Sequence, residues 1–128
     1  MAIISFVNYS FEKVYLLEKV FESCSFQNCI FNYFNSKKGK FLSCHFESYK
    51  IMSSDMTRVE FYDTHFKKCQ SCRGVNLAAS DLSNCKLEKT EFFKSNLNFI
   101  LVENVKVWKS KRKVEVNDLL ILKKDLDE

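Results

Sequence analysis

The side chains with the clearest chemical potential are six cysteines, at positions 24, 29, 44, 69, 72 and 85. Cys69 and Cys72 form a CxxC motif, which occurs both in zinc sites and in redox-active dithiols. A zinc site needs two further ligands nearby and a redox motif needs a thioredoxin-like βαβ context, and the sequence indicates neither. The first residues also lack the basic and long apolar regions of a secretory signal. We therefore expect reduced, buried thiols in the cytosol.

The two histidines, His45 and His65, are 20 positions apart. Catalysis or metal binding by this pair would need a nucleophile or a third ligand beside it, and the sequence predicts neither. An exposed ladder of histidines is the favoured interpretation. A Gly-rich phosphate loop, a catalytic pair of carboxylates and a Ser/His/Asp set are also missing. We predict no catalytic residue, no metal site, no cofactor and no enzymatic activity.

Composition narrows the fold class before any pattern is considered. The chain has 128 residues, a formal net charge of +4, 13 Phe, no Pro and only two Gly, Gly39 and Gly74. Because Pro and Gly normally supply tight turns, their scarcity indicates one repeated turn geometry that ordinary L-residues tolerate. No run of about 18 apolar residues occurs, so we expect a cytoplasmic protein with no membrane segment.

Large apolar residues recur at every fifth position, with Ser36 as the exception before residue 67. The series is Phe6, Phe11, Leu16, Phe21, Phe26, Phe31, Ser36, Phe41, Phe46, Ile51, Met56, Phe61 and Phe66. The register then slips by one residue and continues through Cys72, Leu77, Leu82, Leu87, Phe92, Leu97, Val102 and Val107. Neither the helical period of 3.6 nor the strand period of 2 produces a strict five. The chain is therefore predicted to consist of five-residue structural repeats.

The residue two positions before each large one is usually small. This fits an interior too narrow for two large side chains in every repeat. At Ser36 the order is inverted, because Phe34 occupies the small position, and such an exchange conserves the local volume. Tyr9, Lys19 and Tyr49 fit the small position poorly.

Three segments carry a motif of a small residue, Asp or Asn, Leu and two variable residues. They are Val75-Asn76-Leu77-Ala78-Ala79, Ser80-Asp81-Leu82-Ser83-Asn84 and Ser95-Asn96-Leu97-Asn98-Phe99. In this they resemble the pentapeptide-repeat family, and the resemblance covers about residues 4–109. It implies an all-β fold, a right-handed quadrilateral β-helix with four pentapeptides per coil and with the large and small residues inside. The repeats then make about five coils and a rod of roughly 25 Å.

Stacking of residues one coil apart predicts two charged faces. The Phe6 face, built on Phe6, Phe26, Phe46, Phe66, Leu87 and Val107, becomes basic toward the C-terminus. Its candidate binding residues are His45, His65, Lys67, Lys68, Lys86, Lys89, Lys106 and Lys109. The adjacent Phe21 face, built on Phe21, Phe41, Phe61, Leu82 and Val102, carries the acidic candidates Glu22, Glu60, Asp63, Asp81 and Glu103. Such a face can simply be solvated, or it can bind nucleic acid or a charged protein surface.

The repeat stops at Val107, and we divide the chain into a β-helix over 1–109 and a capping or dimerisation segment over 110–128. Asn117 is a candidate N-cap, and Leu119, Leu122 and Leu126 recur at helical spacing. A short C-terminal helical cap is therefore predicted, which covers the last coil or pairs with a second copy as a homodimer. The resemblance implies the second role, since pentapeptide-repeat proteins that protect DNA gyrase dimerise through such elements.

These features favour a non-catalytic binding protein. The first hypothesis is a protein partner, with the chain acting as an inhibitor or modulator of a cytosolic enzyme, including enzymes that act on nucleic acid. An alternative is direct nucleic-acid binding through the basic face. A second alternative, implied by the resemblance to DNA-mimicking topoisomerase inhibitors, uses the acidic face, although mimicry needs a longer and more acidic rod. A purely structural module is a further interpretation, and the usage of Lys, Asn, Phe and Ser fits a phage product.

Overall fold

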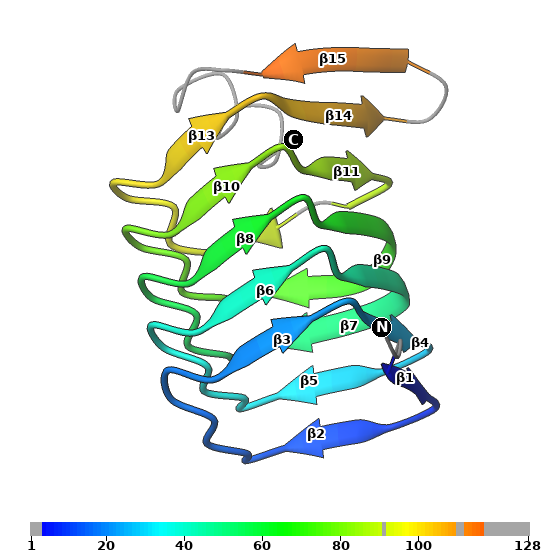
Figure 1. Cartoon of the computed structure of the whole chain (residues 1–128), viewed down its shortest axis with the longest axis vertical. Coiled ribbons are helices and arrows are strands. Elements are labelled where there is room, and N and C mark those ends of the chain that lie inside the picture. The colour runs from blue at the N-terminus through cyan, green and yellow to red at the C-terminus, as the bar shows by residue number, and fades with distance from the viewer. Residues whose placement is uncertain (1–3, 91, 110–111, 117–128) are drawn as a thin grey trace.

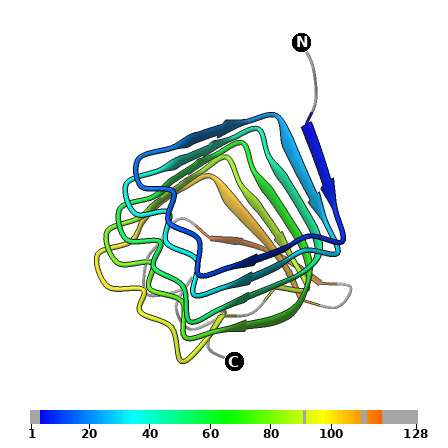
Figure 2. The same ribbon diagram turned by 90° about the horizontal axis from the view of Figure 1, so that it is seen from below.

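The chain winds into a parallel β-solenoid of about five turns, as Figure 1 shows. The structure is a computed structural model, and it describes residues 4–90, 92–109 and 112–116. Seen along the axis, successive coils superpose as a four-sided outline (Figure 2). The predicted all-β solenoid is therefore confirmed.

Strands form three of the four faces. The Phe6 face comprises β1 (Ile4–Val7), β4 (Cys24–Gln27), the first parts of β7 (His45–Met52) and β9 (His65–Arg73), β11 (Lys86–Glu88) and β14 (Val105–Lys109). The Phe11 face comprises β2 (Ser10–Glu12), β5 (Ile30–Asn32), the later parts of β7 and β9, and β12 (Phe92–Phe93). The Phe21 face comprises β3 (Val20–Glu22), β6 (Lys40–Leu42), β8 (Glu60–Tyr62), β10 (Asp81–Ser83) and β13 (Leu101–Glu103).

The fourth face, built on Leu16, Ser36, Met56, Leu77 and Leu97, is made of turns joined by single parallel bridges. Here the side chain of the Asn or Asp before the central residue accepts a hydrogen bond from the backbone two residues later. Asn35 Oδ1 accepts from the N–H of Lys37 at 3.1 Å, and Asn76 Oδ1 accepts from that of Ala78 at 3.1 Å. These hydrogen bonds stabilise the turns, which explains why the motif has Asn or Asp at this position on the fourth face.

Parallel pairing fixes the predicted register. Phe6 pairs with Phe26, Phe26 with Phe46, and Phe46 with Phe66, each one coil of 20 positions apart. The next pair, Phe66 with Leu87, is 21 positions apart, because β9 contains the inserted residue. Equivalent positions therefore stack at the strand spacing of about 4.8 Å along the whole solenoid.

Every corner uses a residue in the left-handed region, located two positions after the large residue. The structure has 19 such non-glycine residues, from Asn8 (φ 62°) to Asn104 (φ 53°), and Gly74 (φ 67°). The backbone N–H of these residues donates to the next coil, as Asn8 does to Gln27 O at 3.0 Å and Arg58 to Ala78 O at 3.0 Å. The repeated turn geometry is thus confirmed, and the conformational cost of an L-residue there, about 1–2 kcal/mol, is offset by the coil-to-coil ladder.

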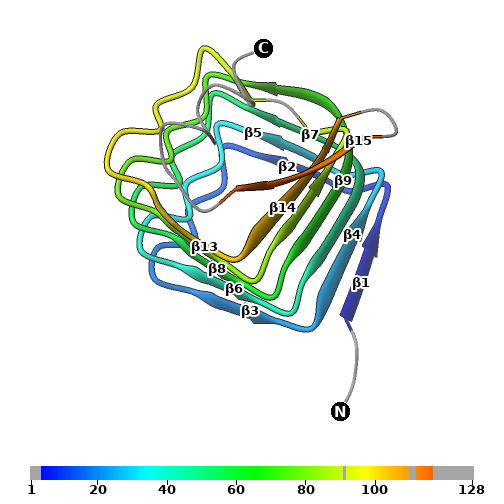
Figure 3. The ribbon, with the colours of Figure 1, turned by 90° about the horizontal axis from the view of Figure 1, so that it is seen from above.

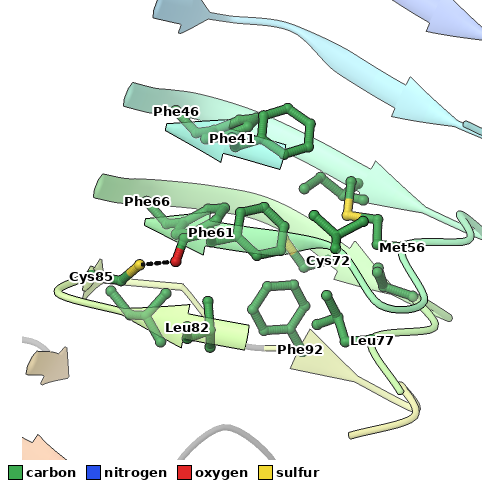
Figure 4. Close-up of a cluster of buried hydrophobic side chains, with 14 of the residues drawn as sticks. Phe41, Phe46, Met56, Phe61, Phe66, Cys72, Leu77, Leu82, Cys85 and Phe92 are labelled. Atoms are coloured by element: carbon green, nitrogen blue, oxygen red, sulfur yellow. Dashed lines mark hydrogen bonds between the residues drawn. The ribbon is translucent and has the colours of Figure 1, made fainter. Parts of the chain in front are cut away.

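Stacked aromatic rings fill the first three coils. The ring centroids of Phe26 and Phe46 lie 4.8 Å apart and those of Phe46 and Phe66 lie 4.9 Å apart, with nearly parallel planes. Below them in Figure 4, Leu82 takes the place of Phe61 in its column, and Leu77 follows Met56. The smaller side chains leave an apolar cavity of about 10 Å³ in this part of the core.

The three residues that fit the small position poorly have different explanations. Tyr9 and Lys19 belong to the first coil, where the end of the solenoid is open among the described residues, and both are exposed. Tyr49 is fully buried, and its hydroxyl lies 3.0 Å from the hydroxyl of Thr90, two coils further on. Its ring therefore extends past the inserted residue in β9. The exchange of Phe34 and Ser36 is also confirmed, since both side chains are buried.

Four cysteines line the interior as reduced thiols: Cys24, Cys29, Cys44 and Cys85. The Cys85 thiol donates to Phe61 O at 3.3 Å (Figure 4), and Thr64 in the same column donates to Phe41 O at 3.0 Å. Burial raises the pKa of Cys44 to about 11 and that of Cys85 to about 12, so neither is a thiolate at neutral pH. The expectation of reduced thiols is wrong for Cys69 and Cys72, which form a disulfide.

The C-terminal end continues with a strand rather than directly with a helix. β15 (Arg112–Val116) pairs antiparallel with β14, at the end of the solenoid seen nearest in Figure 3. The predicted helix, with Asn117, Leu119, Leu122 and Leu126, lies outside the described residues. The division at residue 109 and the dimerisation role remain predictions.

We expect Phe46→Ala to lower the free energy of unfolding by about 3–5 kcal/mol, because the ring is 0% exposed and stacks on rings of both neighbouring coils. Urea unfolding followed by circular dichroism measures the change. Phe93→Ala is the control, because Phe93 is 47% exposed and should cost less than about 1 kcal/mol. Equal effects of the two substitutions would contradict the core assignment.

The neighbouring alanines Ala78 and Ala79 test the corner geometry, because only Ala79 has a positive φ (57°). Ala79→Gly should stabilise the protein by about 0.5–1 kcal/mol, since glycine adopts this conformation without strain. Ala78→Gly should destabilise it by a similar amount. At this position glycine relieves no strain and only increases the conformational entropy of the unfolded chain. Changes of the same sign in chemical denaturation would rule out strain at the corner.

Candidate interaction surfaces

The C-terminal half of the Phe6 face carries a strip of lysines, which we call the basic strip. Its members are Lys67, Lys68, Lys86, Lys89 and Lys106. The side chains that flank the buried central residue point outward, and pairing of Lys86 with Lys106 places these two cations one coil apart. Like charges in directly paired positions destabilise a sheet. The repulsion between Lys86 and Lys106 therefore lowers the stability of the fold, and a bound anionic group would reduce that repulsion.

None of the five lysines of the basic strip forms an ion pair within 4.0 Å among the described residues. The acids of this face, Glu47 and Glu88, lie instead beside the two histidines. Lys109, the last predicted member, ends β14 and is placed here by its backbone only. The structure therefore brings the predicted lysines together in one strip, in which Lys67 is paired with Glu47 and with Glu88 on the neighbouring coils.

The histidines are half-buried rather than the exposed ladder that the sequence suggested. Their ring centroids lie 4.9 Å apart with perpendicular planes. His65 Nε2 lies 3.4 Å from Glu88 Oε1 and His45 Nε2 lies 3.8 Å from Glu47 Oε2. Burial lowers the pKa of His65 from its ordinary value; Glu88 opposes this shift, whereas His45, Lys86 and Lys67 reinforce it. His65 is therefore held neutral between cationic neighbours.

The Phe21 face carries the predicted acidic residues. Glu60 and Asp81 are paired across adjacent coils, while Glu22, Asp63 and Glu103 lie beside or at the end of their strands. Glu60 is partly neutralised by Lys40, whose Nζ lies 3.4 Å from Glu60 Oε2. The predicted acidic face is thus present, and its charge is interrupted near the middle.

Exposed apolar side chains share the Phe21 face with these acids, which the sequence reasoning missed. Val20 is 56% exposed, Tyr62 is 51% exposed and Leu101 is 63% exposed. Tyr62 flanks the buried Phe61, while Val20 and Leu101 flank the partly buried Phe21 and Val102, so their outward direction was readable from the five-residue register. A pattern of charges alone does not reveal them, because none of the three is charged at neutral pH.

Two open hollows lie on and beside this face. One, of about 230 Å³, is lined by Lys40, Leu42, Glu60, Phe61, Tyr62, Asp81 and Ser83. The other, of about 280 Å³, lies at the corner toward the Phe6 face and is lined by Asp63, Asn84, Cys85, Lys86, Asn104 and Lys106. Both mix cationic and anionic groups, which suits contact with another surface rather than one small charged ligand.

The described part of the chain holds no group of three or more His, Cys, Asp or Glu side chains that could bind a metal ion. Among the same residues no helix is long and apolar enough to cross a membrane.

Comparison with known proteins gives one family match. Residues 71–106 match the family model of pentapeptide repeats, in 8 copies. A solved pentapeptide repeat protein (Rfr23) from the cyanobacterium Cyanothece 51142 is similar at 9% identity and a TM-score of 0.46, over 82% of this chain and 88% of that one. QnrB1, a plasmid-mediated fluoroquinolone resistance protein, aligns at 9% identity and a TM-score of 0.25, over 99% of both chains. No curated protein matches the sequence.

We predict that acidification destabilises the protein through His65. Its folded-state pKa is lower than in the unfolded chain, so the unfolded state binds the proton more readily. Stability should therefore fall as the pH drops below the ordinary histidine value of 6.5. Urea unfolding at a series of pH values should show this slope in the wild type and a clearly smaller one in His65→Asn.

His45→Asn is the matched control, because it removes one repulsive neighbour of His65 but leaves its burial unchanged. In this variant the free energy of unfolding should still fall with decreasing pH, but less steeply than in the wild type. A slope that is the same in the wild type and in His65→Asn would show that other groups cause it.

Proposed function

The chain belongs to the pentapeptide-repeat family, and from that premise we propose that it is a non-catalytic, protein-binding inhibitor or modulator of a cytosolic enzyme. The observation that carries the proposal is the mixed character of the Phe21 face. Exposed Val20, Tyr62 and Leu101 stand there among carboxylates.

A protein partner suits this face better than a nucleic acid does. Protein–protein interfaces combine apolar and aromatic contacts with charged groups, and Tyr is enriched among the residues that dominate binding. Phosphate groups would be repelled by Glu22, Asp63, Asp81 and Glu103. The complementary surface is therefore a basic and partly apolar patch on a folded protein.

The solenoid also presents this face in a preformed state. Strands β3, β6, β8, β10 and β13 are joined by continuous parallel pairing, so adjacent coils hold one another in place. Binding to a preformed surface costs less ordering entropy than binding through a loop. A short solenoid of this kind can bind an enzyme as a rigid body, without a change in its own fold.

The basic strip supports a second candidate, direct binding of nucleic acid. Its support is the set of five lysines without ion pairs among the described residues. Imitation of DNA by the acidic face is less well supported, because the Lys40–Glu60 pair and the exposed apolar side chains interrupt the negative charge. Homodimer formation through residues 110–128 stays a proposal that is independent of both.

The decisive experiment recovers the partner and then measures its affinity. A photoreactive residue at position 62 crosslinks contacting proteins in a nuclease-treated lysate, and the identified protein is purified and titrated. Tyr62→Ser combined with Leu101→Ser should weaken binding by roughly 30-fold. Tyr33→Ser should leave the affinity unchanged, because Tyr33 is 57% exposed but lies at the corner after β5, away from the Phe21 face.

Nucleic acid is tested in parallel with a fluorescent DNA duplex and with a Lys67→Glu, Lys68→Glu, Lys89→Glu variant. Steeply salt-dependent binding that this variant abolishes would favour the second candidate. Such a result, together with a partner affinity that is insensitive to Tyr62 and Leu101, would overturn the protein-binding proposal.

A further inference from the structure

The disulfide between Cys69 and Cys72 lies at a β-bulge in β9. Tyr49 pairs with Cys69 and the next residue, Lys50, pairs with Ser71, so Gln70 has no partner in the ladder. Cα atoms three residues apart in a regular strand are about 10 Å apart and their side chains point to opposite sides. Here the Cα atoms of the two cysteines are 6.3 Å apart. The bulge is what allows the two sulfur atoms to meet.

The two cysteines differ in access to solvent. Cys72 occupies a central core position and is 1% exposed, whereas Cys69 is only partly buried. Cys69 is therefore the more accessible of the two cysteines to a nucleophile from solution. This asymmetry separates the pair from Cys24, Cys29, Cys44 and Cys85, which are all buried and free.

Several cationic residues adjoin the bulge. Lys68 precedes Cys69, Arg73 follows Cys72 and Lys50 pairs with Ser71. The backbone N–H of Cys69 donates to Lys89 O at 3.1 Å, which places a fourth cationic residue in the next coil. A positive surrounding attracts thiolates and anionic thiols and favours thiol–disulfide exchange.

We propose that Cys69 and Cys72 form a reversible thiol–disulfide site, whose reaction partner is a small dithiol or a glutathione-class thiol. A thiolate of the reductant attacks Sγ of Cys69, the Cys69–Cys72 bond breaks, and Cys72 leaves and takes up a proton because its buried position disfavours charge. A second thiol of the reductant then attacks the mixed disulfide and releases Cys69. Two electrons and two protons reach the protein, and the reductant leaves as its own disulfide.

Reduction leaves the same side chains in the core but breaks the covalent bond that joins the two sides of the bulge. The Cys72 thiol still fills its position between Ile51 and Phe92 in the Phe11 column. The chain from Cys69 to Cys72 regains conformational freedom, while Tyr49 continues to pack beneath it. The oxidation state of this site therefore sets the local stability of the fourth coil.

Thiol titration and thermal melting of the full chain test the site. After mild oxidation, denatured protein should show four free thiols, and after incubation of the folded protein with dithiothreitol it should show six. The reduced protein should melt roughly 5 °C lower and should exchange amide hydrogens faster at residues 69–73. Cys69→Ser should reproduce the reduced protein under both conditions, because it keeps Cys72 in the core.

Cys24→Ala is the matched control, since it removes a free buried thiol and should retain the full difference between oxidised and reduced protein. Six titratable thiols after oxidation would overturn the proposal. A disulfide that dithiothreitol reduces only in unfolded protein, or identical melting of both forms, would overturn it as well. None of these outcomes depends on which partner the Phe21 face binds.

Discussion

The ladder of hydrogen bonds between successive coils is the interaction on which the rest of the structure depends. Each repeat turns its corner through a residue with positive φ, and the N–H of that residue donates to the coil that follows. An L-residue in this conformation is strained, so a single such turn would not persist by itself. The turns persist because they recur at one spacing, which lets every coil satisfy the backbone of its neighbour.

The core follows from this spacing. Residues one coil apart must lie about 4.8 Å apart, which is close to the distance at which aromatic rings stack, and the Phe columns have centroid separations of 4.8–5.2 Å. In the fourth and fifth coils Leu replaces Phe and the packing becomes looser. The buried Tyr49 and the bulge in β9 stand where the two kinds of core meet, and the inserted residue gives the chain room for that transition.

The surface is also a product of the register. Side chains on either side of a central residue point outward and stack on the side chains at the same position in the neighbouring coils. A preference for charged or apolar residues at one position of the repeat therefore produces a charged or apolar column on the surface. The Phe6 face acquires its basic strip in this way, and the Phe21 face acquires its mixture of acids with Val20, Tyr62 and Leu101. Two adjacent faces of opposite character on one rigid rod give it the means to orient a partner as well as to bind it.

The sequence by itself determined the period and the inward residues, because a strict five-residue pattern marks which large side chains are buried. The arrangement of these residues into four faces was implied by the resemblance to the pentapeptide-repeat family. The sequence also determined where the register slips, at residues 67–71. Only the tertiary structure decided what happens at particular places along that pattern. The disulfide depends on how a bulge brings Cys69 to Cys72. The half-buried His65 meets Glu88 one coil away, and the buried Tyr49 meets a hydroxyl 41 positions further along the chain. Periodicity assigns each of these residues to a column, but only the packed coils show which of them come into contact.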